Sequence, residues 1–204
     1  MRRMAVIGIT GGIASGKSTF RGILAGILSA QTADADLIAR DFLENDPGVK
    51  ARIQEKISPR AYRTDGAPDR AEIRRAIYSD PAAKERIEAI LHPLVRKAWT
   101  SAADLARKEN RHLLVDIPLL FETNATPHFD FIITVACSPD VQDARLKARG
   151  MEPDLARSII RSQMPQDEKI SRSTQVVWND GNMESLRAQA EQFAAMVLSG
   201  AALP

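Results

Sequence analysis

Short apolar runs alternate with longer segments of helical period along this chain. Residues 4–9 form an apolar run that predicts a strand, and residues 20–28 carry apolar side chains at the spacing of a helix. Similar runs predict further strands at 112–116, 129–136 and 175–178, and the more polar segment 31–34 is interpreted as a short strand or strand end. Helical patterns separate most of these runs, and the last helix is predicted at 183–198. This alternation favours a parallel sheet flanked by helices.

A mostly helical block interrupts the alternation between about residues 58 and 110. It contains turn residues at 64–68, and helical patterns follow them. His92-Pro93 should end one of these helices, because proline lacks an N–H and clashes with the preceding turn. We expect one domain whose core spans about 1–57 and 111–204, with the helical block inserted as a substrate subdomain.

The strongest candidate site is the octapeptide from Gly11 to Ser18, Gly-Gly-Ile-Ala-Ser-Gly-Lys-Ser. It fits the phosphate-binding loop pattern G-x-x-x-x-G-K-[ST] and lies between a predicted strand and a predicted helix. Glycines let such a loop turn its N–H groups inward as an anion nest, and the helix N-terminus adds donors. Lys17 would reach the β- and γ-phosphates of a nucleotide, and Ser18 would ligate Mg²⁺. The alternative is a glycine-rich turn with an exposed lysine.

Composition narrows the class of protein. The 204 residues carry a net charge of +2, which does not favour nucleic acid as a partner, because such proteins concentrate basic residues in a stripe. Cys137 is the single cysteine, and the apolar run before it predicts a buried side chain. His92, His112 and His128 lack the spacing of a zinc site. No run approaches the ~18 apolar residues of a membrane helix, so we expect a cytoplasmic protein.

Aspartates follow two of the predicted strands. Asp116 ends the strand at 112–116, which is the usual setting of a Mg²⁺-associated carboxylate in phosphate-loop enzymes, although many strands end in Asp. Asp34 and Asp36 follow the strand at 31–34, and ligands bind at the carboxyl ends of strands in doubly wound sheets. They could hold Mg²⁺-bound water and accept a proton from an attacking hydroxyl. The alternative is that Asp36 caps a helix.

Two arginines form a further candidate. Arg145 and Arg149 are four residues apart on a helix predicted at 139–149, so they share a face. They could stabilise charge on a transferring phosphoryl group. The alternative is a solvated helix face.

Several longer motifs join these features into a resemblance. They are the segment 8–19 around the phosphate loop, Asp34-Ala35-Asp36 with Ala39-Arg40, Asp69-Arg70, Leu91-His92-Pro93, Pro118-Leu119-Leu120-Phe121-Glu122, Ser138-Pro139, Gln163, and Asn179 near Gly181. They run through almost the whole chain, and the Asp-Ala-Asp, His-Pro and Pro-Leu-Leu-Phe-Glu combination is far more restrictive than the loop alone. On these residues, the chain resembles the dephospho-coenzyme A kinase family.

The resemblance implies an α/β fold of the P-loop kinase type: a three-layer sandwich with a parallel sheet, an inserted helical acceptor domain and a helical lid at about 145–172. It implies transfer of the γ-phosphoryl group of ATP to the ribose 3′-hydroxyl of dephospho-coenzyme A, the final step of coenzyme A biosynthesis. ATP and Mg²⁺ are the cofactors it implies. The expected partner is this small molecule, with no nucleic acid, no membrane and no obligate protein partner.

The resemblance also assigns roles to single residues. Lys17, Asp36 and Arg145 are the expected catalytic residues, with Asp36 as the base. The nucleotide is expected to contact Gly12, Ile13, Ala14, Ser15, Gly16, Lys17, Ser18, Thr19, Arg149 and Asn179, the last near the adenine. The acceptor is expected to contact Asp34, Asp36, Arg40, His92, Pro118, Leu119, Leu120, Phe121 and Glu122. Ser18 and Asp116 are the expected metal residues.

Three departures from the family pattern and three rival functions stay open. Ala14 stands where glycine is more usual, Trp178 stands where the family often has an acidic residue, and the segment 60–68 fits the pattern poorly. One rival is another kinase of this fold, for nucleoside monophosphates or shikimate. A GTP-dependent switch is disfavoured by Asp116-Ile117-Pro118 in place of Asp-x-x-Gly and by the lack of an Asn-Lys-x-Asp motif. An ATP-driven motor or transporter subunit is disfavoured because the chain is short and has no internal signature sequence.

Overall fold

The structure is a computed structural model that describes residues 4–200. The chain divides into two compact units. One comprises the residues up to Ala33 and those from Ala102 onward, and the other comprises residues 34–101. The phosphate-binding loop belongs to the first unit, and the candidate base Asp36 belongs to the second.

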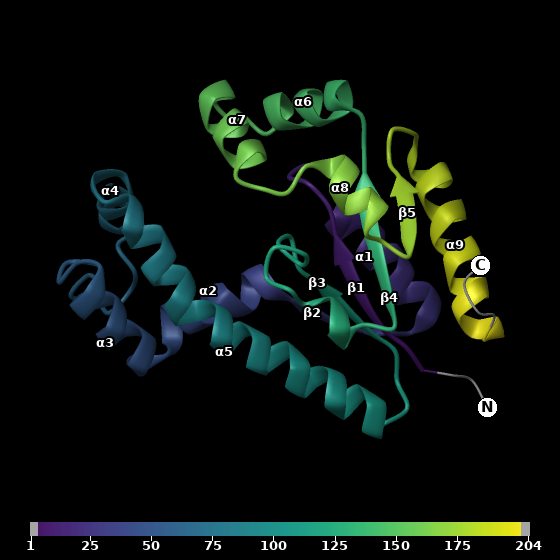
Figure 1. Ribbon diagram of the computed structural model, residues 1–204, viewed down its shortest axis with the longest axis horizontal. Coiled ribbons are helices and arrows are strands. Elements are labelled where there is room, and N and C mark those ends of the chain that lie inside the picture. The colour runs from purple at the N-terminus through teal and green to yellow at the C-terminus, as the bar shows by residue number, and fades with distance from the viewer. Residues whose placement is uncertain (1–3, 201–204) are drawn as a thin grey trace. The chain divides into compact units, whose positions relative to one another are not determined.

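A five-stranded sheet in the order β2-β3-β1-β4-β5 forms the centre of the first unit (Figure 1). The strands are β1 Val6–Thr10, β2 Gln31–Asp34, β3 Leu113–Asp116, β4 Phe131–Ala136 and β5 Gln175–Trp178, close to the predicted runs. The pairs β1–β3, β1–β4 and β4–β5 are parallel, and Ile9 is in register with both Asp116 and Ile133. The carboxyl ends of these strands therefore meet at one edge, where the phosphate-binding loop follows β1.

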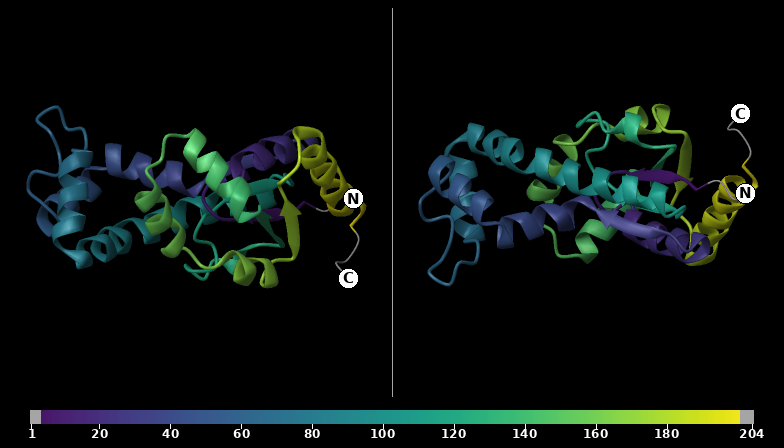
Figure 2. Two further views of the ribbon diagram at one scale, coloured as in Figure 1. Left: turned by 90° about the horizontal axis from the view of Figure 1, so that it is seen from above. Right: turned by 90° about the horizontal axis from the view of Figure 1, so that it is seen from below.

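The helices of the first unit are α1 Lys17–Leu28, α6 Pro139–Ala148, α7 Pro153–Arg161, α8 Gln166–Ser171 and α9 Met183–Ser199, with a 3₁₀ turn η1 at Thr126–His128. Figure 2 shows α1 and α9 side by side. Phe20 and Leu24 of α1 join Phe193 of α9 in a core that includes Ile7 and Ile133 of the sheet. Helix α6 follows β4 directly, so it starts at the carboxyl edge of the sheet (Figure 1).

The second unit is helical and begins earlier than the predicted insertion. It contains α2 Ala35–Asn45, α3 Pro47–Lys56, α4 Arg70–Ser79 and most of α5 Pro81–Lys108. Val49 and Ile53 of α3 pack with Ile73 of α4 and Ile90 of α5 in one hydrophobic core, with Phe42 of α2 against it. The first two helices are therefore part of this unit's core, which is why it starts at residue 34 rather than near 58.

His92-Pro93 does not interrupt a helix, so that prediction is wrong. Helix α5 runs through both residues for 28 residues. Proline removes one N–H from the helix, and the buried side chains of Ile90 and Val95 hold the segments before and after it. Packing on both sides thus outweighs the local loss at Pro93.

Cys137 is buried directly after β4, as the sequence predicts. Burial raises the pKa of its thiol, so the side chain stays neutral at pH 7.

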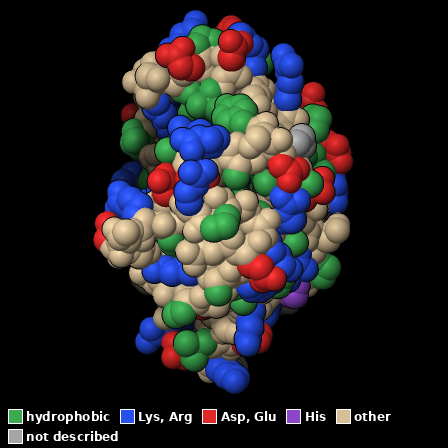
Figure 3. All heavy atoms as spheres, turned by 90° about the vertical axis from the view of Figure 1, so that its left-hand side faces the viewer, with side chains coloured by type: hydrophobic (Ala, Val, Ile, Leu, Met, Phe, Trp, Pro, Cys, Tyr) green, Lys and Arg blue, Asp and Glu red, His purple; other side chains and the backbone are tan. Residues whose placement is uncertain are grey.

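Lys and Arg side chains are interspersed with Asp and Glu over the face drawn in Figure 3. Among residues 4–200, no helix is long and apolar enough to cross a membrane.

Two glycines of α1 can test how helix backbone entropy contributes to the stability of the protein. Gly22 and Gly26 are exposed, and a Cβ at either position would meet no heavy atom within 4 Å. Because alanine loses less backbone entropy than glycine in a helix, Gly22→Ala and Gly26→Ala should each raise the free energy of unfolding by about 0.5–1 kcal/mol. Gly150→Ala is the control, because its surroundings are equally open but its φ is +68°. It should lower the free energy of unfolding by about 1 kcal/mol in urea denaturation. A rise at Gly150 or a fall at the helical positions would contradict this account.

Candidate active site

Every backbone carbonyl of the phosphate-binding loop, from Gly11 to Gly16, accepts a hydrogen bond. Some donors are local. The Lys17 ammonium lies 2.9 Å from Gly11 O and 3.0 Å from Gly12 O, and Phe20 N donates to Gly16 O at 3.1 Å. The other carbonyls bind side chains from distant segments. Because an unpaired buried carbonyl is costly, these donors fix the direction in which each peptide group faces.

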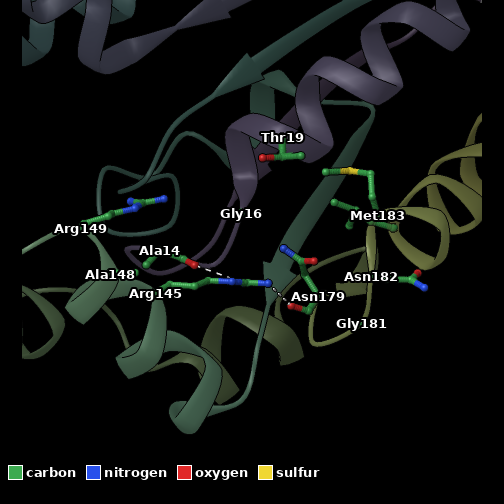
Figure 4. A pocket seen from close by; sticks show the side chains of 11 residues that line it. Ala14, Gly16, Thr19, Arg145, Ala148, Arg149, Asn179, Gly181, Asn182 and Met183 are labelled. Atoms are coloured by element: carbon green, nitrogen blue, oxygen red, sulfur yellow. Dashed lines mark hydrogen bonds between the residues drawn. The ribbon is translucent and has the colours of Figure 1, made fainter.

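Arg145 of α6 makes two of these distant contacts and a third hydrogen bond outside the loop. Its Nη1 donates to Ala14 O and to Ser15 O, both at 3.3 Å, and its Nη2 donates to Asn179 O at 2.8 Å. The Asn179 carboxamide donates to Ser15 O at 2.7 Å. Figure 4 shows Arg145 extending from its helix to Asn179. The solvated-face alternative is therefore wrong for Arg145.

The N-terminus of α1 lacks a side-chain cap. Its N-cap residue is Gly16, with φ +96°, and this residue makes no side-chain capping hydrogen bond. Helices α2, α3 and α4 in contrast each have an aspartate as cap. A Cβ on Gly16 would lie 2.0 Å from Asn179 Nδ2, and one on Gly11 would lie 2.2 Å from Val135 O, so both positions need glycine. The uncapped helix end and the glycine loop fit an anion such as a nucleotide phosphate.

A cavity of about 370 Å³ opens beside the loop, within the ~300–1,000 Å³ range of small-molecule sites. It is lined by Ala14, Gly16, Thr19, Arg145, Ala148, Arg149, Asn179, Gly181, Asn182, Met183 and Leu186. In Figure 4, Arg149 lies on one side of the loop, and Met183 lies with Asn179 on the other. Of the predicted nucleotide residues, the structure thus brings Ala14, Gly16, Thr19, Arg149 and Asn179 together around one cavity.

The two predicted metal residues lie near the loop. Asp116 is buried at the end of β3, and Arg21 Nη1 of α1 lies 3.5 Å from its Oδ2. Ser18 is exposed in the first turn of α1. Residues 4–200 contain no group of three or more His, Cys, Asp or Glu side chains that could hold a metal.

The segment Pro118–Glu122 forms a turn after β3, and its last three side chains point inward. Leu120 and Phe121 are buried, and a Cβ on Gly8 of β1 would lie 2.7 Å from Leu120 Cδ1. Glu122 Oε1 accepts the Met164 N–H at 2.8 Å. Burial acts to raise the pKa of Glu122, but this N–H and the Lys169 ammonium hold it below its usual value. The segment is therefore fixed by its interior contacts.

Four predicted acceptor residues belong to the second unit. Asp34 is the N-cap of α2 and accepts hydrogen bonds from Asp36 N at 3.0 Å and Leu37 N at 3.1 Å. The capping alternative is therefore wrong for Asp36, which lies exposed in the first turn of that helix. Arg40 Nε donates to Glu44 at 2.9 Å, and His92 is exposed on α5. The roles of these residues stay predictions.

A family model for dephospho-CoA kinase matches residues 5–185 of the chain. The chain belongs to the dephospho-CoA kinase family. It is therefore a kinase, an enzyme that transfers a phosphoryl group.

Relatives in this family extend over nearly the whole chain. The dephospho-CoA kinase of Anaeromyxobacter dehalogenans is 38% identical over 199 residues, which is 97% of this chain and 94% of the relative. That of Gloeobacter violaceus is 38% identical over 188 residues, 92% of this chain and 90% of the relative. Both identities lie above what a shared fold alone would give.

Solved structures confirm the predicted P-loop kinase fold. A Thermus thermophilus protein matches with a TM-score of 0.75 and 31% identity, covering 95% of this chain and 98% of its own. The dephospho-CoA kinase from Campylobacter jejuni matches with a TM-score of 0.73 and 22% identity, covering 96% and 98%. A shikimate kinase from Acinetobacter baumannii matches with a TM-score of 0.54 and 13% identity, covering 98% of this chain and 96% of its own. This likeness shows the fold alone.

Sequence reasoning missed two glutamines that hold the loop of this dephospho-CoA kinase family member. Gln142 Nε2 donates to Ile13 O at 2.7 Å, and Gln163 Oε1 accepts the Ile13 N–H at 3.2 Å. Gln163 entered only as part of the family motif. The one signal for Gln142 was its place three residues before Arg145 on the same helix face. Ala14, the departure from glycine, has φ +59° and packs its methyl group with Leu146.

Arg145 and Arg149 should respond differently to truncation. Arg145→Ala removes hydrogen bonds to three backbone carbonyls, so the free energy of unfolding should fall by about 2–3 kcal/mol and binding of a nonhydrolysable Mg·ATP analogue should weaken. Arg149→Ala leaves the loop contacts in place, so stability should change by less than about 0.5 kcal/mol. Urea denaturation and calorimetric titration separate the two effects. Equal stability in both variants would show that the Arg145 contacts do not hold the loop.

Proposed function

We propose that this protein transfers the γ-phosphoryl group of ATP to the ribose 3′-hydroxyl of dephospho-coenzyme A. Membership of the dephospho-CoA kinase family supports the acceptor. The observation that carries the nucleotide side is the loop whose carbonyls are all bonded, beside a helix N-terminus with no side-chain cap. The Ile13 N–H already donates to Gln163 and the Ser15 N–H to Gly12 O, so phosphate would take other N–H groups of the loop and of the first turn of α1.

On the phosphate side, this chain contributes mainly positioning and positive charge, as phosphoryl transfer requires. We assign to Lys17 the β- and γ-phosphates, where its ammonium would leave the loop carbonyls it now contacts. Arg145 lies against the loop and would face charge that develops on the transferring group. Arg149 would contact the nucleotide from the cavity rim, and Asn179 would lie beside the adenine.

Ser18 and Asp116 are the residues proposed to hold Mg²⁺, Ser18 directly and Asp116 directly or through water. The ion, when bound, would supply positive charge that offsets the charge of the phosphates. The Asp116 carboxylate would help to position the ion, and Arg21 lies beside this carboxylate. We place the reaction in the cytoplasm, where ATP is the common phosphoryl donor.

On the acceptor side, Asp36 is proposed as the base that takes the proton of the 3′-hydroxyl. Its carboxylate does not cap α2, because Asp34 has that role. Asp34, Arg40 and His92 are proposed as acceptor contacts of the same unit. The segment Pro118–Glu122 would contribute through the shape of its turn, since three of its side chains point inward.

A kinase of this fold for another small acceptor is the second candidate, and the shikimate kinase structures share the fold with this chain. That likeness has 13% identity, against 38% for the dephospho-CoA kinase relatives. The acceptor experiment below decides between them.

The acceptor should be selected by its length. An extended acceptor supplies binding energy far from the reacting hydroxyl that helps to orient it. We expect dephospho-coenzyme A to be phosphorylated far more efficiently than adenosine or AMP, with the difference in kcat as well as in KM. Coupled assays and mass spectrometry should place the new phosphate on the ribose 3′ position. Lys17→Ala is the inactive control, because loss of a phosphate contact costs about 3 kcal/mol or more in the transition state. Equal efficiency with AMP would move the protein to the nucleoside monophosphate kinases.

Asp36 can be tested apart from capping. Asp36→Asn should lower kcat by ~10² or more with little change in the KM for ATP, because a positioned proton acceptor contributes about that much. Asp46→Asn is the matched control, since Asp46 caps α3 by accepting the Val49 N–H at 2.8 Å and an asparagine keeps that acceptor. We expect wild-type kcat in the control. An Asp36→Asn enzyme with wild-type kcat would exclude Asp36 as the base.

A further inference from the structure

Lys169 of α8 has a buried ammonium that the proposed reaction does not use. Its side chain is 1% exposed, and lysine is among the residues least often buried. Its Nζ donates to Pro118 O at 2.6 Å and lies 3.0 Å from Glu122 Oε1. One side chain from the end of the lid region therefore binds both ends of the turn that follows β3.

The Pro118 carbonyl also accepts a bond from the strand that leads into the phosphate-binding loop. Thr10 Oγ1 donates to Pro118 O at 3.1 Å. Thr10 is buried, ends β1 and immediately precedes Gly11, the first residue of the loop. The Lys169 backbone is fixed in turn, because Thr134 Oγ1 of β4 donates to its carbonyl at 3.3 Å. Pro118 O is thus a shared acceptor that joins β1, the turn and α8.

The Glu122 end of the turn is tied to the residues between α7 and α8. Its Oε1 accepts the Met164 N–H, and its Oε2 is buried without a hydrogen-bond partner among the described residues. The Arg172 guanidinium stacks 4.8 Å from the centre of the Phe121 ring. Helix α8 and the residues on either side of it therefore contact the turn at three places, Met164, Lys169 and Arg172, of which Lys169 is the most buried.

We propose that Lys169 is a positioning residue for phosphoryl transfer, holding the Pro118–Glu122 turn and the base of the lid in fixed register with the phosphate-binding loop. The proposal rests on the proposed function, which puts this turn on the acceptor side. A buried ion pair is a poor source of stability, because an apolar pair of similar volume often stabilises as well or better. The arrangement here does what an apolar pair would not do: it directs donors at one particular backbone carbonyl beside the loop.

The first experiment separates positioning from stability at Lys169. Lys169→Met leaves the largely buried Glu122 carboxylate without its counter-ion, so it should lower both Tm and kcat. Lys169→Met/Glu122→Met removes both charges and should recover most of the Tm. If Lys169 is a positioning residue, the double variant should keep a kcat with dephospho-coenzyme A that is ~10- to 100-fold below wild type at temperatures where it is fully folded. Misplacement of reacting groups predicts a loss of this size. Affinity for a nonhydrolysable Mg·ATP analogue should stay within about threefold. Lys108→Met, at an exposed position of α5, is the control and should match wild type.

A second pair of variants leaves Lys169 and Glu122 in place. Thr10→Val removes the hydroxyl that bonds to Pro118 O at nearly constant volume, whereas Thr10→Ser keeps it. We expect Thr10→Val to lower kcat in the same direction as the lysine variant, and Thr10→Ser to stay near wild type. Recovery of kcat together with Tm in the double variant, or wild-type kcat in Thr10→Val, would overturn the proposal.

Hydrogen exchange distinguishes this proposal from the proposed function. In the double variant, the amides of 119–123 and 164 should exchange at least ~10-fold faster than in wild type, while those of α9 stay unchanged. If wild-type protein does not phosphorylate dephospho-coenzyme A, the proposed function fails. Faster exchange of the turn in the double variant would still support the role of Lys169 in holding the turn. Unchanged exchange of the turn would overturn the positioning role whichever acceptor the enzyme uses.

Discussion

A phosphate-binding loop can present its N–H groups to an anion only if its carbonyls face the other way, and each of those carbonyls then needs a donor. In this protein, side chains from distant segments meet this requirement for Ile13, Ala14 and Ser15. Arg145 serves Ala14 and Ser15, Asn179 also serves Ser15, and Gln142 serves Ile13. The nest is thereby shaped from outside by residues more than 120 positions away in the chain.

The rest of the first unit follows from that requirement. Helix α6 carries Gln142 and Arg145, and its place is set by β4, which pairs with β1 directly beside the loop. Ser138 begins α6 and donates its N–H to Asp180 at 2.7 Å, which lowers the pKa of that carboxyl and keeps it ionised at neutral pH. The segment that carries Asn179 is therefore tied to the start of the helix that carries Arg145. Substitutions in any one of these elements should change the conformation of the loop.

Ala14 shows how packing offsets strain within this arrangement. A non-glycine residue at φ +59° costs roughly 1 kcal/mol, which a glycine would avoid. The Ala14 methyl group is buried with Leu146 and Ala156, so it gains apolar contacts with α6 and α7 in return. The departure from the usual glycine therefore joins the loop to the two helices that follow β4.

The sequence predicted the parts of this protein whose signals are local. The loop from Gly11 to Ser18 has a fixed spacing, and the strands are short apolar runs, so both were found with nearly correct bounds. Helix α5 continues through Pro93 because tertiary packing outweighed a local rule, and the six-residue α8 is too short to show a period. Asp34 rather than Asp36 caps α2, which two aspartates so close in sequence could not reveal. Lys169 belongs to a type that is usually exposed, and only distant partners make its burial possible.

We infer that the side chains from α6 and residue 179 hold the loop in one shape before any nucleotide arrives. Backbone ¹⁵N relaxation of residues 12–16 in the ligand-free protein tests it most directly. The account predicts order parameters of about 0.85, equal to those of β1 and α1, and little further change when a Mg·ATP analogue is added. Order parameters below about 0.6 that rise only on nucleotide binding would contradict it, because the side chains from α6 and residue 179 would then not be holding the loop.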